Sequence, residues 1–250
     1  MLASVMEALR RFTAERLFSR FAGPLAFALP AREGYALWAE NYPPRPHNPL
    51  METEQSVVEP LLAASMSQAR HGRPARALDV GTGTGRYLPL LASAGARIVV
   101  GLDMSMGMLD HNTCGQPRVC GDACRLPFPD RSFDLVCSSL MAGDVEDLGA
   151  WVREAGRVLA PGGHLVYSDF HPSWDAARWR RTFRTVDGRQ LELSYFPHSI
   201  DQHLTLLEDG PFDVRAIREP RIKGLRHPVV VVFHAVKRHS PAMPLFLERC

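Results

Sequence analysis

The feature that most constrains this chain is a glycine-rich turn between an apolar run and a helical pattern. Residues 77–91 read ALDVGTGTGRYLPLL, with glycines at positions 81, 83 and 85. This order predicts a strand, a tight turn and the N-terminus of a helix. Glycines let the backbone turn sharply and let a ligand lie against the main chain, while a helix start offers free N–H groups to an anionic ligand group. Asp79, at the end of the strand, can accept hydrogen bonds from the turn or face a cationic group.

Two common nucleotide-binding patterns do not fit this turn. The dinucleotide fingerprint G-x-G-x-x-G needs its third glycine at position 86, which is Arg86. The phosphate-binding P-loop needs a Lys-Ser/Thr pair after its last glycine, and Arg86-Tyr87 does not supply one. The stretch resembles the first motif of the class I S-adenosylmethionine (SAM) methyltransferases, an acidic residue followed by G-x-G-x-G. The resemblance implies SAM as the cofactor and S-adenosylhomocysteine (SAH) as its product.

Length, composition and charge are those of an ordinary globular protein. The chain has 250 residues, of which 46% are hydrophobic and 22% charged, so one sizeable α/β domain is expected. Its net charge of +2 argues against nucleic acid as a partner. The apolar runs are too short to span a membrane, and no signal-peptide pattern opens the chain. Five cysteines without a C-x-x-C pair indicate reduced thiols in a cytoplasmic protein, and no metal site is expected.

Two further motifs extend the resemblance. A second apolar run ends at Asp103, about 20 residues after the glycines, where a carboxylate can bind ribose hydroxyls. NAD-binding proteins share this feature, so it indicates a ribose without choosing the cofactor. The segment Gly121-Asp122-Ala123, followed by Leu-Pro-Phe at 126–128 and Phe-Asp at 133–134, resembles one in the ubiquinone-pathway methyltransferases. There the Asp side chain and the next N–H bind the adenine, roles that the resemblance gives to Asp122 and Ala123.

The resemblance covers roughly residues 35–236 and implies an α/β, Rossmann-like class I methyltransferase fold. It implies a seven-stranded sheet with an antiparallel last strand, a helical N-terminal lid and a β-hairpin cap. We expect a helical extension at 1–34 and the methyltransferase domain at 35–240, with a substrate cap at 172–200. Later elements follow from periodicity: strands at 133–140, 164–170, 212–217 and 228–233, helices at 49–66, 151–159 and 199–207, and a turn at 160–163.

The segment before the nucleotide domain predicts a lid. Residues 1–21 have apolar residues at helical spacing, which favours a lid or dimer helix over a membrane-surface helix. Residues 35–48 then read YALWAENYPPRPHN, similar to a segment that folds over the cofactor in biotin- and ubiquinone-pathway methyltransferases. The resemblance implies that Tyr42, and with it His47, contacts the methionine end of the cofactor. The alternative is an aromatic cluster that packs one helix onto the next.

A β-hairpin is expected within the cap. Residues 182–185 and 190–195 flank the sequence VDGR, whose Asp-Gly pair is a strong hairpin turn. Four arginines lie in or beside it, Arg178, Arg180, Arg181 and Arg184. They indicate either a solvated face or a site for an anionic small-molecule acceptor or an acidic carrier protein.

The site residues follow from the motifs and from the resemblance. The residues expected to bind the cofactor are Tyr42, His47, Asp79, Gly81, Thr82, Gly83, Gly85, Asp103, Met104, Met108, Asp122, Ala123 and Ser138. A base is needed only when the nucleophile arrives protonated. His171 is the expected base, because it follows the strand at 164–170 and an imidazole titrates near neutrality; His198 and His203 are the alternatives.

The predicted function is SAM-dependent methyl transfer to a small molecule, with oxygen as the expected acceptor ahead of carbon or nitrogen. Two other classes stay open. One is a nucleic-acid or protein methyltransferase, against which the near-neutral charge speaks. The residues 137–140, Cys-Ser-Ser-Leu, also differ from the Asn/Asp-Pro-Pro-aromatic motif of enzymes that methylate DNA bases. The other class keeps SAM but catalyses a cyclisation or elimination, or serves as a binding partner.

Overall fold

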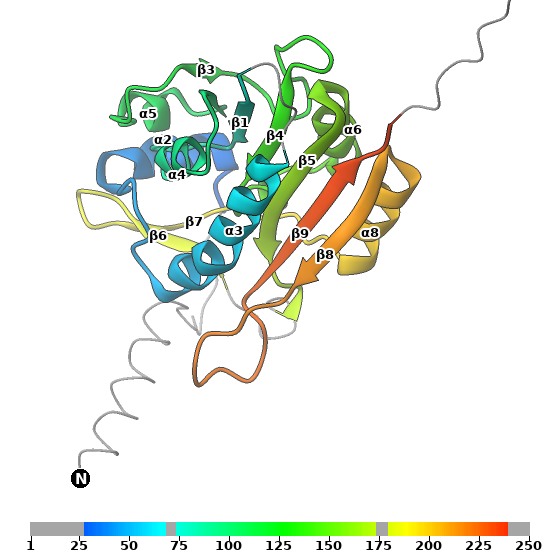
Figure 1. Cartoon of the computed structure of the whole chain (residues 1–250). Helices are drawn as coiled ribbons and strands as arrows, with labels where there is room; N and C mark the ends of the chain where they lie inside the picture. The colour runs from blue at the N-terminus through cyan, green and yellow to red at the C-terminus, as the bar shows by residue number, and fades with distance from the viewer. Residues whose placement is uncertain (1–27, 69–73, 174–179, 240–250) are drawn as a thin grey trace, which may run out of the picture.

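The fold is centred on one seven-stranded sheet (Figure 1). The computed structural model describes residues 28–68, 74–173 and 180–239. The predicted helix at 1–21 and Arg178 lie outside these residues. The strands are β1 (Arg76–Val80), β2 (Ile98–Asp103), β3 (Arg118–Cys120), β4 (Phe133–Ser138), β5 (Leu159–Phe170), β8 (Phe212–Arg218) and β9 (Val230–Lys237). Their order is β3-β2-β1-β4-β5-β9-β8.

The strand directions confirm the predicted class I methyltransferase fold. Strands β1 to β5 pair in parallel, whereas β9 runs antiparallel to both β5 and β8. Ligands bind beyond the carboxyl ends of the strands in open sheets of this kind, near the point where the strand order reverses. That point lies between β1 and β4, so the topology alone puts a site next to the glycine turn.

Helices cover both faces of the sheet. They are α2 (Ala31–Trp38), α3 (Pro49–Ser67), α4 (Leu88–Ser93), α5 (Met106–Asp110), α6 (Leu148–Val158) and α8 (Ile200–Asp209), with short 3₁₀ helices η1 (Ala39–Asn41) and η2 (Ala142–Asp144). One apolar cluster joins α3 and α4 to the sheet, and a second joins α6 and α8 to its other face. Successive residues of a strand point to opposite faces, so buried Val166 packs in the first cluster and Tyr167 in the second.

Side-chain caps fix where several helices begin. Asn48 accepts a hydrogen bond from the Met51 N–H at 2.9 Å, and Pro49 occupies the first helical position of α3. The Ser105 and Ser199 side chains cap α5 and α8. Each cap satisfies an N–H that has no partner within the helix.

The predicted turn at 160–163 is a bulge within a longer strand. Phe133 pairs with Leu159 and Leu135 pairs with His164, so the residues between Leu159 and His164 loop out without ending β5. Gly162 has a φ of 77°, a conformation that other residues rarely adopt. The Pro-Gly-Gly pattern therefore breaks the strand locally, and pairing with β4 and β9 carries the strand past the break.

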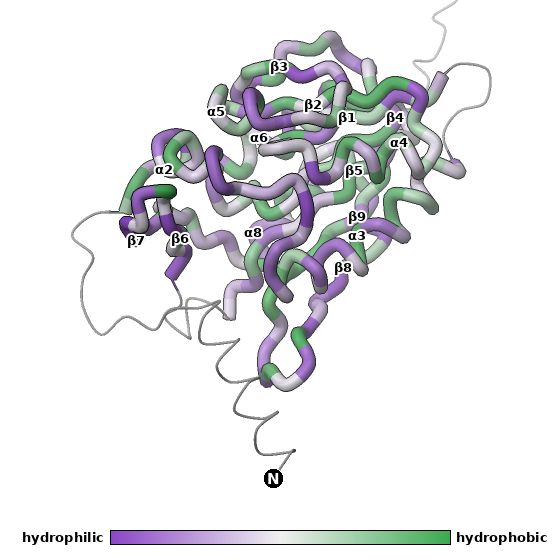
Figure 2. The backbone as a smooth tube through the Cα atoms, turned by 90° about the vertical axis from the view of Figure 1, so that its left-hand side faces the viewer, coloured by the Kyte–Doolittle hydropathy of each residue, from purple (hydrophilic) through white to green (hydrophobic). Residues whose placement is uncertain are grey.

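The predicted hairpin forms and lies against the N-terminal segment. Strands β6 (Thr182–Arg184) and β7 (Gln190–Glu192) pair antiparallel, and Gly188 in the turn has a φ of 85°. Figure 2 shows α2 beside β6 and β7. The rings of Trp38 and Phe183 stack at 5.0 Å, and the Leu29 N–H donates to the Glu192 carbonyl at 2.8 Å. The lid helix and the hairpin thus form one packed unit. Among the described helices, none is both long and apolar enough to cross a membrane.

Candidate cofactor and acceptor site

The glycine turn is tied to the neighbouring strand and opens into a cavity. The Gly81 and Thr82 N–H groups donate to the Leu102 carbonyl at 2.8 and 2.9 Å, which holds the turn at the end of β2. Gly81 and Gly83 have φ values of 72° and 55°. A Cβ on Gly81 would lie 2.6 Å from the Met141 side chain, whereas one on Gly83 would meet no atom within 4 Å. Gly83 therefore leaves open space for a ligand directly above its backbone.

Asp103 is held rigidly at the end of β2. Its Oδ2 accepts from the Gly83 N–H and its Oδ1 from the Ser105 N–H, each at 2.8 Å. Burial raises the pKa of Asp103, and these two hydrogen bonds oppose that rise. Each carboxylate oxygen has a second lone pair that can accept from a ribose hydroxyl. The geometry fits the predicted ribose role.

Asp79 is a buried carboxylate that faces the same cavity. It is 1% exposed, and its Oδ1 has no hydrogen-bond partner among the described residues. Burial raises its pKa to about 7. An unpaired buried carboxylate is costly unless a cation or donor meets it. Asp79 therefore suits the ammonium group at the methionine end of SAM.

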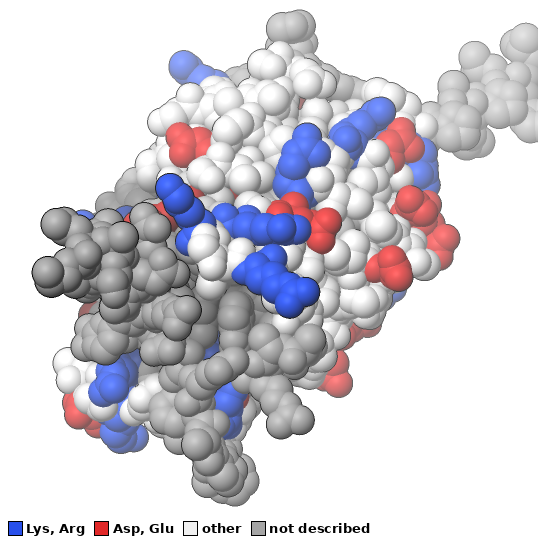
Figure 3. Space-filling view, turned by 90° about the horizontal axis from the view of Figure 1, so that it is seen from below, with Lys and Arg blue, Asp and Glu red and all other residues white. Residues whose placement is uncertain are grey.

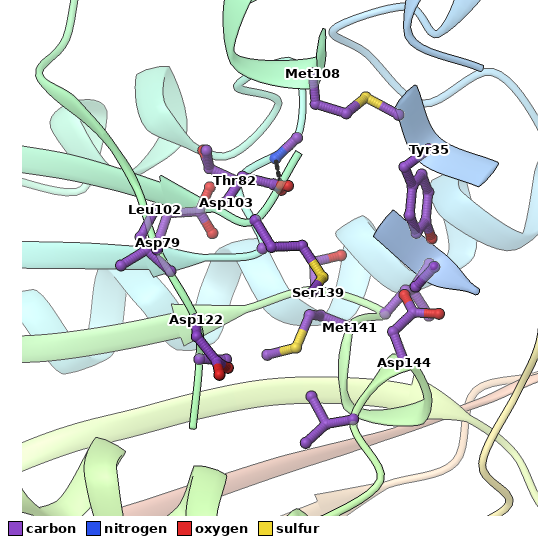
Figure 4. A pocket seen from close by; sticks show the side chains of 18 of the residues that line it. Tyr35, Asp79, Thr82, Leu102, Asp103, Met108, Asp122, Ser139, Met141 and Asp144 are labelled. Atoms are coloured by element: carbon purple, nitrogen blue, oxygen red, sulfur yellow. Dashed lines mark hydrogen bonds between the residues drawn. The ribbon is translucent and has the colours of Figure 1, made fainter. Parts of the chain in front are cut away.

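The cavity has two chemically different ends (Figure 4). Asp79, Asp103 and Asp122 lie toward one end, and Tyr35 and Asp144 lie toward the other. Between them stand side chains from the end of β4, Met141 among them. The first end has the groups expected for an adenosine and an amino acid. The second end is free for an acceptor.

Most of the predicted cofactor residues line this one cavity. These are Tyr42, Asp79, Gly81, Thr82, Gly83, Asp103, Met104, Met108, Asp122 and Ala123. They come from the lid, the glycine turn, the end of β2, α5 and the segment after β3. Residues more than 80 positions apart in the sequence, such as Tyr42 and Ala123, are thus brought together by the sheet topology.

Four predicted residues do not line the cavity. Gly85 packs against Asn112, whose side chain would lie 2.6 Å from an added Cβ, and Ser138 is buried at the end of β4. His47 packs edge-on against Tyr42, with ring centroids 5.0 Å apart. His171 lies 2.8 Å from the Glu219 carboxylate and 2.9 Å from the Ser173 hydroxyl. Direct roles for these four stay predictions.

Sequence reasoning missed a buried polar network beneath the cavity. Arg86, which it treated only as a mismatch to other motifs, donates to Glu54 at 3.0 Å and to the Ser139 hydroxyl at 2.5 Å. Glu54 lies in α3 and is fully buried. Burial alone would lower the pKa of Arg86, but interactions led by the negative charge of Glu54 oppose this effect and together outweigh it. The pKa of Arg86 is therefore raised, and its guanidinium stays charged. The one sign of this network in the sequence was Glu54 itself, a charged residue on the apolar face of the α3 helix.

Two of the four cap arginines form ion pairs within the chain. Arg180 pairs with Glu192, and Arg181 pairs with Asp144 at 2.5 Å. Other exposed cations lie at the end of β8 and on the segment after it, at Arg218, Arg221, Lys223 and Arg226. Figure 3 shows Lys and Arg side chains gathered on the lower face of the molecule with few acidic groups among them. Arg180 and Arg181 are therefore neutralised within the chain, whereas Arg184 is exposed to solvent.

Known proteins match this chain over the segment that builds the site. Residues 78–167 match a family model described as a methyltransferase domain. Over this segment the chain is similar to the methyltransferase type 11 family, which is in class I. The family implies SAM as cofactor, and the carboxylates of Asp79, Asp103 and Asp122 with the open backbone of Gly83 fit that molecule.

Several curated relatives carry methyltransferase names. A demethylmenaquinone methyltransferase of Mycolicibacterium gilvum is 44% identical over 96 residues, which cover 38% of this chain and 42% of that protein. A malonyl-[acyl-carrier protein] O-methyltransferase of Methylococcus capsulatus is 38% identical over 144 residues, covering 54% of this chain and 50% of that protein. The chain thus spans half or less of the length of these relatives.

Solved structures share the fold at low sequence identity. A SAM-dependent methyltransferase from Mesorhizobium loti aligns with a TM-score of 0.56 at 24% identity, over 70% of this chain and 96% of that one. The [4+2]-cyclase SpnF aligns with a TM-score of 0.60 at 17% identity, over 86% of this chain and all of that one. Both likenesses concern the fold alone.

Proposed function

We propose that this protein is a SAM-dependent methyltransferase that acts on the oxygen of a small molecule. The observation that carries the proposal is Asp103, fixed by the Gly83 and Ser105 N–H groups at the end of β2 and facing the same cavity as Asp79 and Asp122. Two relatives with O-methyltransferase names support oxygen as the acceptor atom.

Each part of the cofactor would have its own partners in this cavity. Asp103 would hold the ribose, Asp122 and Ala123 the adenine, and Asp79 the ammonium of the methionine part. The backbone of Gly83 would lie against the ligand, and Tyr42 would close the methionine end. SAM supplies a methyl group that is already activated by its positive sulfur. The residues therefore contribute mainly by aligning an acceptor with that methyl group.

The acceptor would reach the methyl group from the Tyr35 side of the cavity, beneath the lid and the hairpin. A carrier-bound acceptor, expected from the sequence as an alternative, stays a prediction. The name of one relative includes an acyl-carrier protein, and the exposed cations around the end of β8 would suit an acidic carrier.

A calorimetric titration of the wild type and of Asp103→Asn with SAH, SAM and NADH tests the cofactor assignment. We expect the wild type to bind SAM and SAH but not NADH. Asp103→Asn should weaken SAH about tenfold or more, because a hydrogen bond to a charged group contributes about 1.5–3 kcal/mol. Asp110→Asn, on the exposed end of α5, is the matched control and should bind like the wild type. Binding of NADH without SAM would refute the assignment.

The reaction itself needs a separate measurement. Release of SAH in the presence of pooled phenols, alcohols and carboxylic acids would show methyl transfer. Conversion of an acceptor without SAH would instead favour the cyclisation or elimination class.

A further inference from the structure

The cavity end opposite the adenosine residues holds a buried ion pair. Asp144, in η2, and Tyr35, in α2, line the cavity there. Arg181, which precedes β6, donates to Asp144 Oδ1 at 2.5 Å and to the Tyr35 hydroxyl at 2.6 Å. The side chains of Arg181 and Asp144 are only 10% and 7% exposed. Three segments far apart in the sequence thus meet at one charged cluster.

Aromatic rings hold the guanidinium in place. Arg181 lies 4.8 Å above the ring of Phe170 and 5.9 Å from the ring of Tyr195. Its N–H groups are directed at Asp144 and Tyr35, and its flat face is covered. Arg181 therefore orients Asp144 and is not free to bind the acceptor.

The charges around the cavity disfavour an anionic acceptor. Six carboxylates line it: Asp79, Asp103, Asp122, Asp144, Glu146 and Asp147. Arg86 is the one Lys or Arg among the described lining residues, and it is paired with Glu54. A carboxylate or phosphate entering this cavity would face the carboxylates of Asp79 and Asp103, and the one cation among the described lining residues is already paired. A neutral acceptor meets no such barrier.

A neutral hydroxyl acceptor needs a group that takes its proton, and the described lining residues offer one at this end. No described histidine lines the cavity. Glu146 and Asp147 are exposed to solvent, whereas Asp144 is buried and faces the acceptor end. The geometry therefore singles out Asp144.

We propose that Asp144 is the base that accepts the proton of a neutral hydroxyl acceptor bound beside Tyr35, with Arg181 and Tyr35 as positioning residues. The proposal rests on the methyl transfer proposed above. As the acceptor O–H bond breaks, its proton passes to an Asp144 oxygen. The acceptor oxygen forms a bond to the methyl carbon while the S–C bond breaks and its electron pair stays on sulfur. Asp144 then releases the proton to solvent.

The surroundings of Asp144 support this role. Burial raises its pKa, while Arg181 and Tyr35 lower it and the charge of Asp169 raises it. A carboxylate with a raised pKa is a stronger base than an exposed one. The rings of Tyr35 and Tyr42, 6.4 Å apart, and the Met141 side chain between the two ends would cover a planar apolar acceptor such as a phenol.

The test uses two probes of equal shape and different charge, 4-methylphenol and 4-methylbenzoate, on SAH-loaded protein at neutral pH. The phenol is neutral there because its hydroxyl resembles that of tyrosine, with a pKa of about 10. Ligand-observed NMR gives both affinities for the wild type, for Asp144→Asn and for Asp209→Asn. Asp209 is an exposed residue of α8 and serves as the control.

We expect the wild type and Asp209→Asn to bind the phenol and to bind the benzoate at least about tenfold more weakly. Asp144→Asn should reverse this order. Its amide oxygen is a weaker, uncharged acceptor for the phenol hydroxyl. The substitution also leaves Arg181 without its counter-ion and free to attract the carboxylate. A loss of both affinities together would reduce Asp144 to a structural residue and overturn the proposal. An unchanged preference, or no phenol binding to the wild type, would overturn it as well.

Two further readouts separate this inference from the proposed function. If SAH itself does not bind, the proposed function fails before Asp144 is tested. If SAH binds equally to wild type and Asp144→Asn, and methyl transfer to a hydroxyl acceptor falls about 100-fold or more in the variant, both proposals hold. Unchanged turnover with intact SAH binding would refute only the role of Asp144.

Discussion

Glu54 Oε2 lies 3.0 Å from Arg86 Nη1, and both side chains are buried beneath the floor of the cavity. The second oxygen of Glu54 accepts from the hydroxyls of Ser139 and Ser168, each at 2.8 Å. The carboxylate therefore joins α3 to the glycine turn and to the ends of β4 and β5. Such a network is stable only while every member keeps its partners.

Glu54→Gln should destabilise the protein by about 3–5 kcal/mol, the usual cost of leaving a buried charge without its partner. The amide would keep one acceptor oxygen but would leave the Arg86 guanidinium uncompensated. Urea unfolding followed by circular dichroism measures the difference. Glu59→Gln, at an exposed position of the same helix, should change the free energy of unfolding by less than about 0.5 kcal/mol. Equal effects of the two variants would contradict the network.

Asp79 should make the stability depend on pH in the direction opposite to that of an ion-paired carboxylate. Its pKa is raised from 3.8 to about 7 by burial, so the folded protein prefers the protonated form. Its contribution to the free energy of unfolding is complete below about pH 4. That contribution is lost as pH rises from about 4 to about 7, by up to about 4 kcal/mol. Among the charged groups that face Asp79, Arg86 lowers its pKa, whereas Asp103 and Glu54 raise it.

Asp79→Asn should therefore gain stability over the wild type as pH rises toward 7, while losing affinity for SAM. Urea unfolding of both proteins at several pH values gives the difference directly. A stability difference that stays constant with pH would show that Asp79 titrates normally.

Trp38 should hold the lid helix against the hairpin. Its ring stacks on Phe183 at 5.0 Å and meets Tyr42 edge-on at 4.7 Å. Each aromatic pair contributes about 1 kcal/mol, so Trp38→Ala should speed amide hydrogen exchange in residues 31–41 at least about tenfold. Exchange in β4 and β5 should stay unchanged. Leu37→Ala, in the same helix but 42% exposed, is the control and should leave the exchange rates unaltered.

The buried histidine pair between β5 and β9 should lower the free energy of unfolding at acid pH. His164 Nδ1 lies 2.9 Å from His234 Nε2, with Ser65 beside them. Burial, together with the charges of His164, Arg215 and Arg218, lowers the pKa of His234 to about 4. The folded protein thus holds His234 neutral. Its contribution is complete above about pH 6.5 and is lost as pH falls toward 4, by about 3 kcal/mol.

His234→Gln should reduce this acid sensitivity. The free energy of unfolding, measured in urea at neutral pH and at about pH 5, should fall less in the variant than in the wild type. His227→Gln, at an exposed position, should behave like the wild type. An equal loss in all three proteins would show that the histidine pair does not drive the acid response.

Local patterns in the sequence determined the central parts of the fold and the end of the cavity that holds Asp79, Asp103 and Asp122. The turn after β1 needs positive φ at Gly81 and Gly83, and only glycine adopts it without strain. The side chains of Ser105 and Ser199 accept hydrogen bonds from N–H groups three residues further along the chain. Gly188 forms the hairpin turn through its own positive φ. The carboxylate of Asp103 bonds the backbone of Gly83 because a parallel β2 must end beside β1. These features depend on neighbours in sequence or on one strand pairing, so a single sequence predicts them.

The opposite end of the cavity, at Tyr35 and Asp144, depends on tertiary contacts. Arg181 and Tyr35 are 146 positions apart, and their contact requires the lid, the hairpin and η2 to pack together. Strand β5 pairs with β4 on both sides of the Pro-Gly-Gly segment. The Glu219 carboxylate binds His171, the base expected from the sequence, outside the cavity. Side-chain packing between distant segments selects which carboxylate is buried and which arginine is neutralised. The local periodicity of apolar and polar residues does not predict which of these charged residues are buried and paired.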